Sequence, residues 1–204
     1  MLKIHNLSYA FTDKYLFEDI SLNILSGECL KVSGSNGSGK STFLKNIAGI
    51  LSNYEGDIHL NNENTQNIGL SEASKIYYLG HKQALKTNLT ILENIKYDLR
   101  SNFVNTKNIL SEMSKFGCEE SLETVVGTLS EGQKKKILLA TFSVTKSDLY
   151  ILDEPSTNLD KNGCDYLVEV IESKIKEGAT IIYTAHEDKF SFSNEIDIDK
   201  YKNE

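Results

Sequence analysis

An octapeptide at residues 34–41 constrains the fold of this chain more than any other feature, because it fits the pattern G-x-x-x-x-G-K-[ST]. The preceding residues 29–32 are predicted to form a short buried strand, and apolar residues after the octapeptide recur at helical spacing through Leu51. A strand, a glycine-rich turn and a helix in this order make an anion-binding cradle. The backbone N–H groups of the turn point inward, and the helix N-terminus is partially positive. The octapeptide therefore predicts a site for nucleotide phosphates.

The roles of individual loop residues follow from the charge of a nucleoside triphosphate. Lys40 is predicted to reach the β- and γ-phosphates, where it also serves catalysis as a fixed positive charge. The hydroxyl of Ser41 is predicted to bind Mg²⁺. The nucleotide-binding residues expected in this stretch are Gly34, Ser35, Asn36, Gly37, Ser38, Gly39, Lys40, Ser41 and Thr42.

The bulk composition excludes some classes of partner. The net charge of −7 over 204 residues argues against a nucleic-acid partner, because the surface would repel the phosphate backbone. No apolar run approaches the length of a membrane-spanning helix, and the N-terminus lacks the pattern of a signal peptide. The three cysteines have no C-x-x-C spacing, which indicates thiols in a reducing cytosol. We expect no nucleic-acid binding and no direct membrane insertion.

Apolar patterning predicts both sheet and helical regions. The continuous apolar runs at 149–152 and 180–183 are typical of central parallel strands that are buried on both faces. Residues 82–140 are predicted to be mostly helical and placed apart from the sheet. Residues 191–204 are predicted to form an edge element or a loose tail. Further strands are predicted around residues 2–7, 20–24, 56–62 and 76–79.

Two acidic residues directly follow the apolar run 149–152. At the C-terminal end of a buried strand, the carboxylate of Asp153 can hold Mg²⁺, and Glu154 beside it can orient or deprotonate an attacking water. The alternative is a pair of acids that simply ends a strand at the solvent boundary. The phosphate loop favours a metal-binding role for Asp153 and a catalytic role for Glu154.

The segment 129–133 has a local and a functional interpretation. Ser130, with Gln133 three residues later, predicts a capping box that opens a helix. A capped helix N-terminus with a small serine, and with Gly132 for close approach, is also an anion site. The run resembles L-S-G-G-Q, the signature of the ATPase subunits of the ATP-binding cassette (ABC) superfamily, with Glu131 in place of the first glycine.

The resemblance to ABC ATPases covers nearly the whole chain. Residues 151–155 are similar to the Walker B strand of the family, and residues 156–160 are similar to its D-loop. The resemblance implies an α/β fold: a P-loop NTPase with a RecA-like, mostly parallel core, an N-terminal antiparallel β subdomain and an inserted α-helical subdomain. The implied division is a single ABC ATPase domain over 1–204, with the core and β subdomain at 1–81 and 141–204 and the helical subdomain at 82–140.

The resemblance also implies site residues outside the phosphate loop. Phe11 lies about where the family places an aromatic side chain that stacks on adenine, with Tyr9 as the alternative. His186 corresponds to the switch histidine, which contacts the γ-phosphate and takes part in catalysis. His81 stands where most members have a glutamine that contacts Mg²⁺ or the water. Two ATP molecules are expected between two copies of the chain, and the residues acting across that interface are Ser130, Gly132 and Gln133.

One branch of the family is especially similar. Residues 78–81 and 85–94 resemble a Leu-Gly-His run and a Lys-Thr-x-Leu-Thr-x-x-Glu-Asn run in the ATPase subunit of the haem exporter used in cytochrome c maturation. This resemblance implies hydrolysis of ATP with Mg²⁺, a homodimer of ATPase subunits bound to integral membrane subunits, and a location on the cytoplasmic face of the inner membrane. The alternatives are an ABC exporter for another cargo, a soluble ABC ATPase and a small-molecule kinase.

Overall fold

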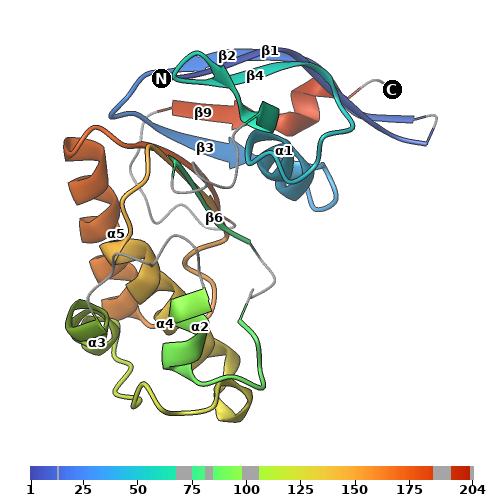
Figure 1. Ribbon diagram of the computed structural model, residues 1–204. Coiled ribbons are helices and arrows are strands. Elements are labelled where there is room, and N and C mark those ends of the chain that lie inside the picture. The colour runs from blue at the N-terminus through green and yellow to red at the C-terminus, as the bar shows by residue number, and fades with distance from the viewer. Residues whose placement is uncertain (13, 68–74, 81–84, 98–105, 186–193, 203–204) are drawn as a thin grey trace.

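A parallel sheet forms the centre of the molecule (Figure 1). The computed structural model describes residues 1–12, 14–67, 75–80, 85–97, 106–185 and 194–202. Each neighbouring strand pair in the order β6-β7-β8-β3-β9 is parallel. These strands are β3 (Cys29–Ser33), β6 (Ile76–Leu79), β7 (Leu149–Asp153), β8 (Thr180–Thr184) and β9 (Asn194–Asp197).

A second, antiparallel sheet has the strand order β2-β1-β4-β5. The pairing of β1 with β2 shifts register between Leu7 and Tyr9 and again between Tyr9 and Ala10. Because bulges interrupt the alternation of a strand, consecutive side chains from Leu7 to Tyr9 are all buried. The strands are β1 (Leu2–Phe11), β2 (Lys14–Ile24), β4 (Glu55–Leu60) and β5 (Glu63–Asn64).

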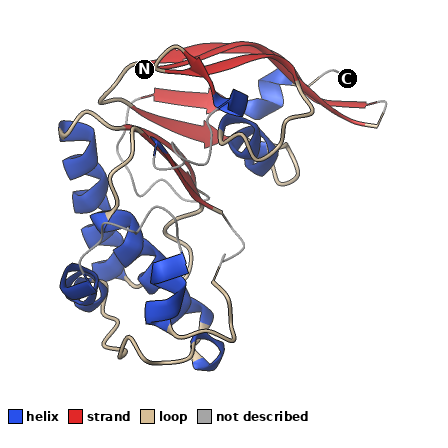
Figure 2. Ribbon diagram, viewed as in Figure 1, coloured by secondary structure: helices blue, strands red, loops and turns tan. Residues whose placement is uncertain are grey.

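The helices lie mostly at the end of the molecule opposite the antiparallel sheet (Figure 2). Among the α-helices, α1 is the exception: it lies beside the two sheets, directly after β3, and the short turns η1 and η5 lie near it. Among the described residues, no helix has the length and apolar character needed to cross a bilayer. The helices are α1 (Lys40–Ile47), α2 (Ile91–Tyr97), α3 (Thr106–Lys115), α4 (Glu131–Val144) and α5 (Lys161–Lys176), with short 3₁₀ turns η1 (Thr65–Asn67), η4 (Val126–Thr128) and η5 (Ile198–Tyr201).

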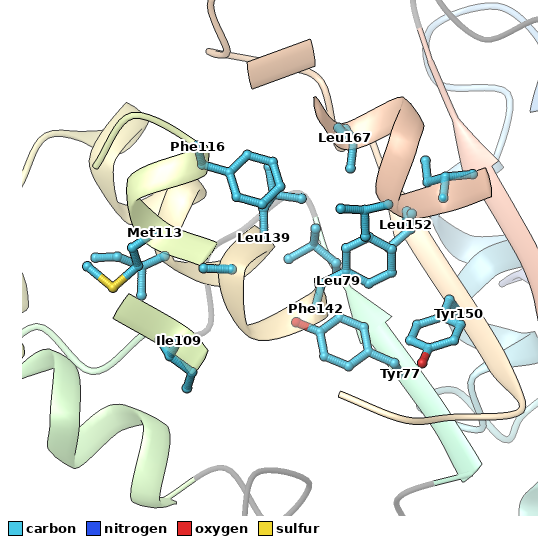
Figure 3. Close-up of a cluster of buried hydrophobic side chains, with 14 of the residues drawn as sticks. Tyr77, Leu79, Ile109, Met113, Phe116, Leu139, Phe142, Tyr150, Leu152 and Leu167 are labelled. Carbon is cyan, nitrogen blue, oxygen red and sulfur yellow. The ribbon is translucent and has the colours of Figure 1, made fainter. Parts of the chain in front are cut away.

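The parallel sheet separates two hydrophobic cores. In β7, Leu149 and Ile151 pack into the core shared with α1 and the antiparallel sheet. Tyr150 and Leu152 point the other way, into the core formed with α3, α4 and α5, which also holds Phe142 (Figure 3). Successive side chains of a strand alternate between faces, so a continuous apolar run fills both cores. The prediction of a central strand at 149–152 is therefore confirmed.

The remaining fold predictions have mixed outcomes. The run at 180–183 is the fully buried strand β8, and the polar tail supplies the edge strand β9 beside β3. The region 82–140 contains α2, α3 and most of α4, but residues 116–125 are not helical. Gly117 adopts a φ of 71° and ends α3, with the N–H of Cys118 donating to the carbonyl of Met113. The division of the chain at residues 81 and 141 stays a prediction.

Candidate nucleotide-binding site

The phosphate loop joins β3 to the N-terminus of α1. Gly39 caps α1 without a side chain, at a φ of 104°, so no capping group competes for the amides of the first helical turn. A Cβ on Gly39 would lie 2.8 Å from the side chain of Leu16, whereas a Cβ on Gly37 would meet nothing within 4 Å. The loop therefore packs tightly on its Gly39 side and is open at Gly37, as an anion cradle requires.

Lys40 points back over this loop. Its Nζ donates hydrogen bonds to the carbonyl oxygens of Gly34, at 2.8 Å, and Ser35, at 3.0 Å. The ammonium is thus held on the loop by weak neutral acceptors, which phosphate oxygens can replace with stronger charge-assisted bonds.

A cavity of about 500 Å³ lies against the loop. Glu154 also lines this cavity, although it follows a different strand and is more than a hundred residues away in the chain. The structure therefore brings together most of the loop residues expected from the sequence with the expected base. The lining residues are Phe11, Leu16, Asn36, Gly37, Ser38, Gly39, Lys40, Ser41, Thr42 and Glu154.

Asp153 ends β7 and is almost completely buried, with 2% of its surface exposed. Its Oδ1 accepts a hydrogen bond of 2.7 Å from the hydroxyl of Thr184 at the end of β8. Its Oδ2 is buried and has no hydrogen-bond partner within the described part of the chain. Mg²⁺ takes hard oxygen ligands, commonly one or two protein carboxylates together with substrate phosphates. An unpartnered carboxylate oxygen at this strand end fits such an ion, although Asp153 does not line the cavity itself.

The backbone of Glu154 is held in an unusual conformation. Its φ is 52°, in the left-handed region that non-glycine residues seldom adopt. Its N–H donates to the hydroxyl of Thr184 at 2.9 Å, and its carbonyl accepts from Nζ of Lys135 at 3.1 Å. Such strain persists only where the surroundings determine it, and it is common at functional sites. Sequence reasoning missed both Thr184 and Lys135.

Residues 130–133 begin α4 and do not line this cavity. Ser130 and Gln133 form the predicted capping box: the N–H of Gln133 donates to Oγ of Ser130, and the N–H of Ser130 donates to Oε1 of Gln133. The Nε2 group of Gln133 donates to Glu120 at 2.7 Å. A Cβ on Gly132 would lie 3.5 Å from the carbonyl oxygen of Asn158. One copy of the chain therefore does not bring this segment to its own phosphate loop.

The two candidate aromatic residues occupy different environments. Phe11 is 70% exposed and lines the cavity, whereas Tyr9 is 9% exposed and belongs to the apolar core. The ring of Tyr9 contacts those of Phe11 and Phe17, with centroids 6.3 and 6.2 Å away. This placement favours Phe11 as the residue that can stack on a base.

The 3₁₀ turn η5 adds a contact that sequence reasoning missed, because an acidic residue in a polar tail carries no local signal. Oδ1 of Asp199 accepts a hydrogen bond of 2.8 Å from the hydroxyl of Ser35, and its Oδ2 accepts from the N–H of Ser35. Lys202 forms an ion pair with Asp199 at 2.6 Å. Lys202 and the donors of Ser35 lower the pKa of Asp199 from 3.8 to about 2. The turn therefore holds the start of the phosphate loop.

Asp199→Asn is expected to give a pH-dependent loss of stability. Because the pKa of Asp199 is lower in the folded chain than in the unfolded one, its contribution is complete above about pH 4 and is lost as the pH falls toward about 2. Urea unfolding between pH 6 and pH 3 is expected to show a difference between wild type and variant that shrinks with acidity. A difference that stays constant over this range would contradict the role of the carboxylate charge.

Two predicted site residues, His81 and His186, lie outside the described residues. The role of His81 at the metal or water and the role of His186 at the γ-phosphate stay predictions.

Comparisons with known proteins agree with this geometry. The family model for ABC transporters matches residues 17–157. The cytochrome c biogenesis ATP-binding export protein CcmA of Aliivibrio fischeri is 33% identical over 198 residues, covering 96% of this chain and 97% of the relative. The protein of the same name from Vibrio cholerae is 34% identical over 193 residues, covering 94% and 93%.

Solved structures agree as well. An ATP-binding subunit of an ABC transporter superimposes with a TM-score of 0.81 at 25% identity, covering 91% of this chain and 79% of the other. A dimeric bacterial ABC transporter cassette superimposes with a TM-score of 0.76 at 25% identity, covering 92% and 88%. The phosphate loop, the strand-end carboxylates and these matches together lead to one conclusion: the chain belongs to the ABC transporter family.

Proposed function

We propose that this chain is the ATP-binding and ATP-hydrolysing subunit of a haem-export complex in cytochrome c biogenesis. The observation that carries the ATPase activity is the cavity shared by the phosphate loop, Phe11 and Glu154. The assignment to haem export is supported by the names of relatives that align over nearly the full length of the chain. ATP hydrolysis then powers the export of haem or the release of a haem-carrying chaperone.

The residues of one copy hold the nucleotide as follows. The amides at the start of α1 and the ammonium of Lys40 bind the phosphates, and Phe11 stacks on the base. Ser41 and Asp153 would hold Mg²⁺, and the ion would supply positive charge beside the phosphates. Glu154 accepts a proton from the attacking water, since this residue lines the cavity directly after β7. The proposed role of His186 is to contact the γ-phosphate. The proposed role of His81 is to contact the metal or the attacking water.

A second copy completes the site. Ser130, Gly132 and Gln133 lie at the N-terminus of α4, which can bind an anion but does not face the cavity of its own chain. ATP binding therefore favours a homodimer in which each signature segment faces the phosphate loop of the other copy. The dimer binds integral membrane subunits and is peripheral to the cytoplasmic face of the inner membrane.

Phe11→Ala is expected to weaken ATP binding about tenfold, because loss of stacking on a base costs about 1–3 kcal/mol. Fluorescence titration with a labelled ATP analogue measures the affinity. Tyr9→Ala is the matched comparison. It is expected to lower the melting temperature instead, since Tyr9 is a buried core residue. Normal affinity in the Phe11 variant, with a large loss of affinity in a folded Tyr9 variant, would reverse the assignment.

Co-purification of the tagged chain with its membrane subunits tests the haem assignment. The complex is expected to contain haem, with an absorption band that changes when ATP is hydrolysed but not when a non-hydrolysable analogue is added. A complex that hydrolyses ATP but neither contains haem nor changes its absorption when haem is added would indicate another cargo.

A further inference from the structure

Helix α4 is tied to the segment after β7 at two charged contacts. Nζ of Lys135 lies 3.1 Å from the carbonyl oxygen of Glu154, and Nζ of Lys136 lies 3.2 Å from Oδ2 of Asp160. The backbone of Asn158 also packs close to Gly132. The helix that begins with the signature segment therefore packs along the segment that carries the proposed base of the same chain.

Lys135 differs from an ordinary surface lysine. Only 5% of its surface is exposed, and burial lowers its pKa to about 8, although the charges of Asp153 and Glu154 oppose this shift. An apolar residue of similar length would fill the same space without the desolvation cost. The lysine adds what a hydrocarbon chain lacks, a donor for the carbonyl oxygen of Glu154.

This donor acts on a strained residue. The left-handed backbone of Glu154 is held by Thr184 at its N–H and by Lys135 at its carbonyl. The carboxylate makes a long contact of 3.5 Å with the hydroxyl of Thr157. The same carbonyl also accepts a hydrogen bond of 3.3 Å from the N–H of Thr157. Loss of the Lys135 contact would therefore remove the shorter and charged one of these two donors and loosen the backbone of Glu154.

We propose that Lys135 is a positioning residue for ATP hydrolysis, which fixes the backbone of Glu154 and so aims its carboxylate into the nucleotide cavity. This inference rests on the proposed function, because it takes Glu154 as the base. It also links two sites in the dimer. Lys135 is five residues after Ser130, about 7.5 Å along the same helix. The helix that faces the partner's nucleotide thus supports the base for the nucleotide of its own chain.

Three variants test the contact in the full-length chain. Lys135→Met keeps the length of the side chain without a donor and is expected to slow single-turnover phosphate release about 10- to 100-fold. The dissociation constant for ATP is expected to change less than twofold. Lys135→Arg keeps a charged donor and is expected to recover most of the rate.

Lys174→Met is the matched control. Lys174 is also 5% exposed, burial lowers its pKa to about 8, and it donates to the carbonyls of Ser143 and Thr145. Its removal is expected to lower the melting temperature without slowing phosphate release. If Lys174→Met slowed release as much as Lys135→Met at a temperature where both are folded, the effect would be general destabilisation and the proposal would be wrong.

Mixed dimers locate the effect. In a dimer of a wild-type copy with a Glu154→Gln copy, only the wild-type copy's base can act, and this dimer is the reference. When Lys135→Met and Glu154→Gln are in different copies, the only active Glu154 is in the copy that lacks Lys135. Slow phosphate release is therefore expected. When both substitutions are in one copy, the active Glu154 is in the wild-type copy and keeps its contact with Lys135. Phosphate release at the reference rate is therefore expected.

The other outcomes overturn the proposal. Slow release only when both substitutions share one copy would mean that Lys135 presents Ser130 to the partner's nucleotide. Equal rates for the two mixed dimers would mean that Lys135 has no specific action on Glu154. Failure of the proposed function is recognised separately, because the wild-type homodimer would then release no phosphate from ATP. Failure of Glu154 as the base is recognised by a Glu154→Gln homodimer that hydrolyses ATP at the wild-type rate.

Discussion

Glu154→Gln is expected to lower the rate of ATP hydrolysis by about 10²- to 10⁴-fold while ATP binding is retained. Glutamine has nearly the same shape as glutamate but cannot accept the proton of the attacking water. The backbone contacts with Thr184 and Lys135 do not depend on the carboxylate, so the fold of the site is expected to survive. Phosphate release measures the rate. Gel filtration with ATP is expected to show accumulation of a closed dimer that the wild type forms only briefly.

Glu172→Gln is the control for this substitution. Glu172 lies on α5, half exposed, with Nζ of Lys176 3.8 Å from its carboxylate. Such a surface pair contributes little, so hydrolysis and dimerisation are expected to match wild type. Normal turnover by Glu154→Gln would remove Glu154 from the role of base.

The part of the nucleotide cavity that is formed by consecutive residues could be predicted from the sequence. The phosphate loop needs glycines, a lysine and a hydroxyl residue at fixed spacing. Residues 36–42 line the cavity, whereas Gly34 and Ser35 do not. The capping box at Ser130 is equally local and is confirmed. The strand before Asp153 was recognisable because both of its faces are buried, which requires a continuous apolar run.

Contacts between distant segments were not predictable in this way. Asp199 reaches Ser35 across 164 residues, and Thr184 reaches Asp153 across 31. Lys135 was missed because it lies between Lys134 and Lys136 in a run that is typical of a solvated helix face. Successive helical residues differ by about 100° around the axis, so three consecutive lysines cannot all face solvent on a helix packed along one side.

The choice between Tyr9 and Phe11 was open for a related reason. Strict alternation along a strand places these two residues on the same face, so the pattern does not separate them. The register shifts around Tyr9 break that alternation, and Tyr9 is buried while Phe11 is exposed. A bulge inserts or displaces one residue without a strong sequence signal, so only the folded strand distinguishes the two aromatic residues.

Phe142→Ala is expected to destabilise the chain by about 3–5 kcal/mol, the usual cost of removing a fully buried aromatic ring. Phe142 on α4 has no exposed surface, and its ring packs against Tyr77 of β6 and Tyr150 of β7, with centroids 5.8 and 5.3 Å away (Figure 3). Nζ of Lys174 lies 5.1 Å from the same ring. The substitution therefore leaves a cavity and removes a cation–π contact. Urea unfolding measures the change in free energy.

The control for Phe142→Ala is Phe11→Ala, which also removes an aromatic ring. Its free energy of unfolding is measured without nucleotide. Because Phe11 is 70% exposed, its removal is expected to change the free energy of unfolding by no more than about 0.5 kcal/mol. A loss below about 1 kcal/mol in Phe142→Ala would show that the neighbouring tyrosines fill the space and that the ring is not a fixed part of the core. A loss of the expected size would instead show that α4 is anchored rigidly to the sheet at its C-terminal end. That anchor fixes the position of the N-terminal part of α4, from which Lys135 holds Glu154.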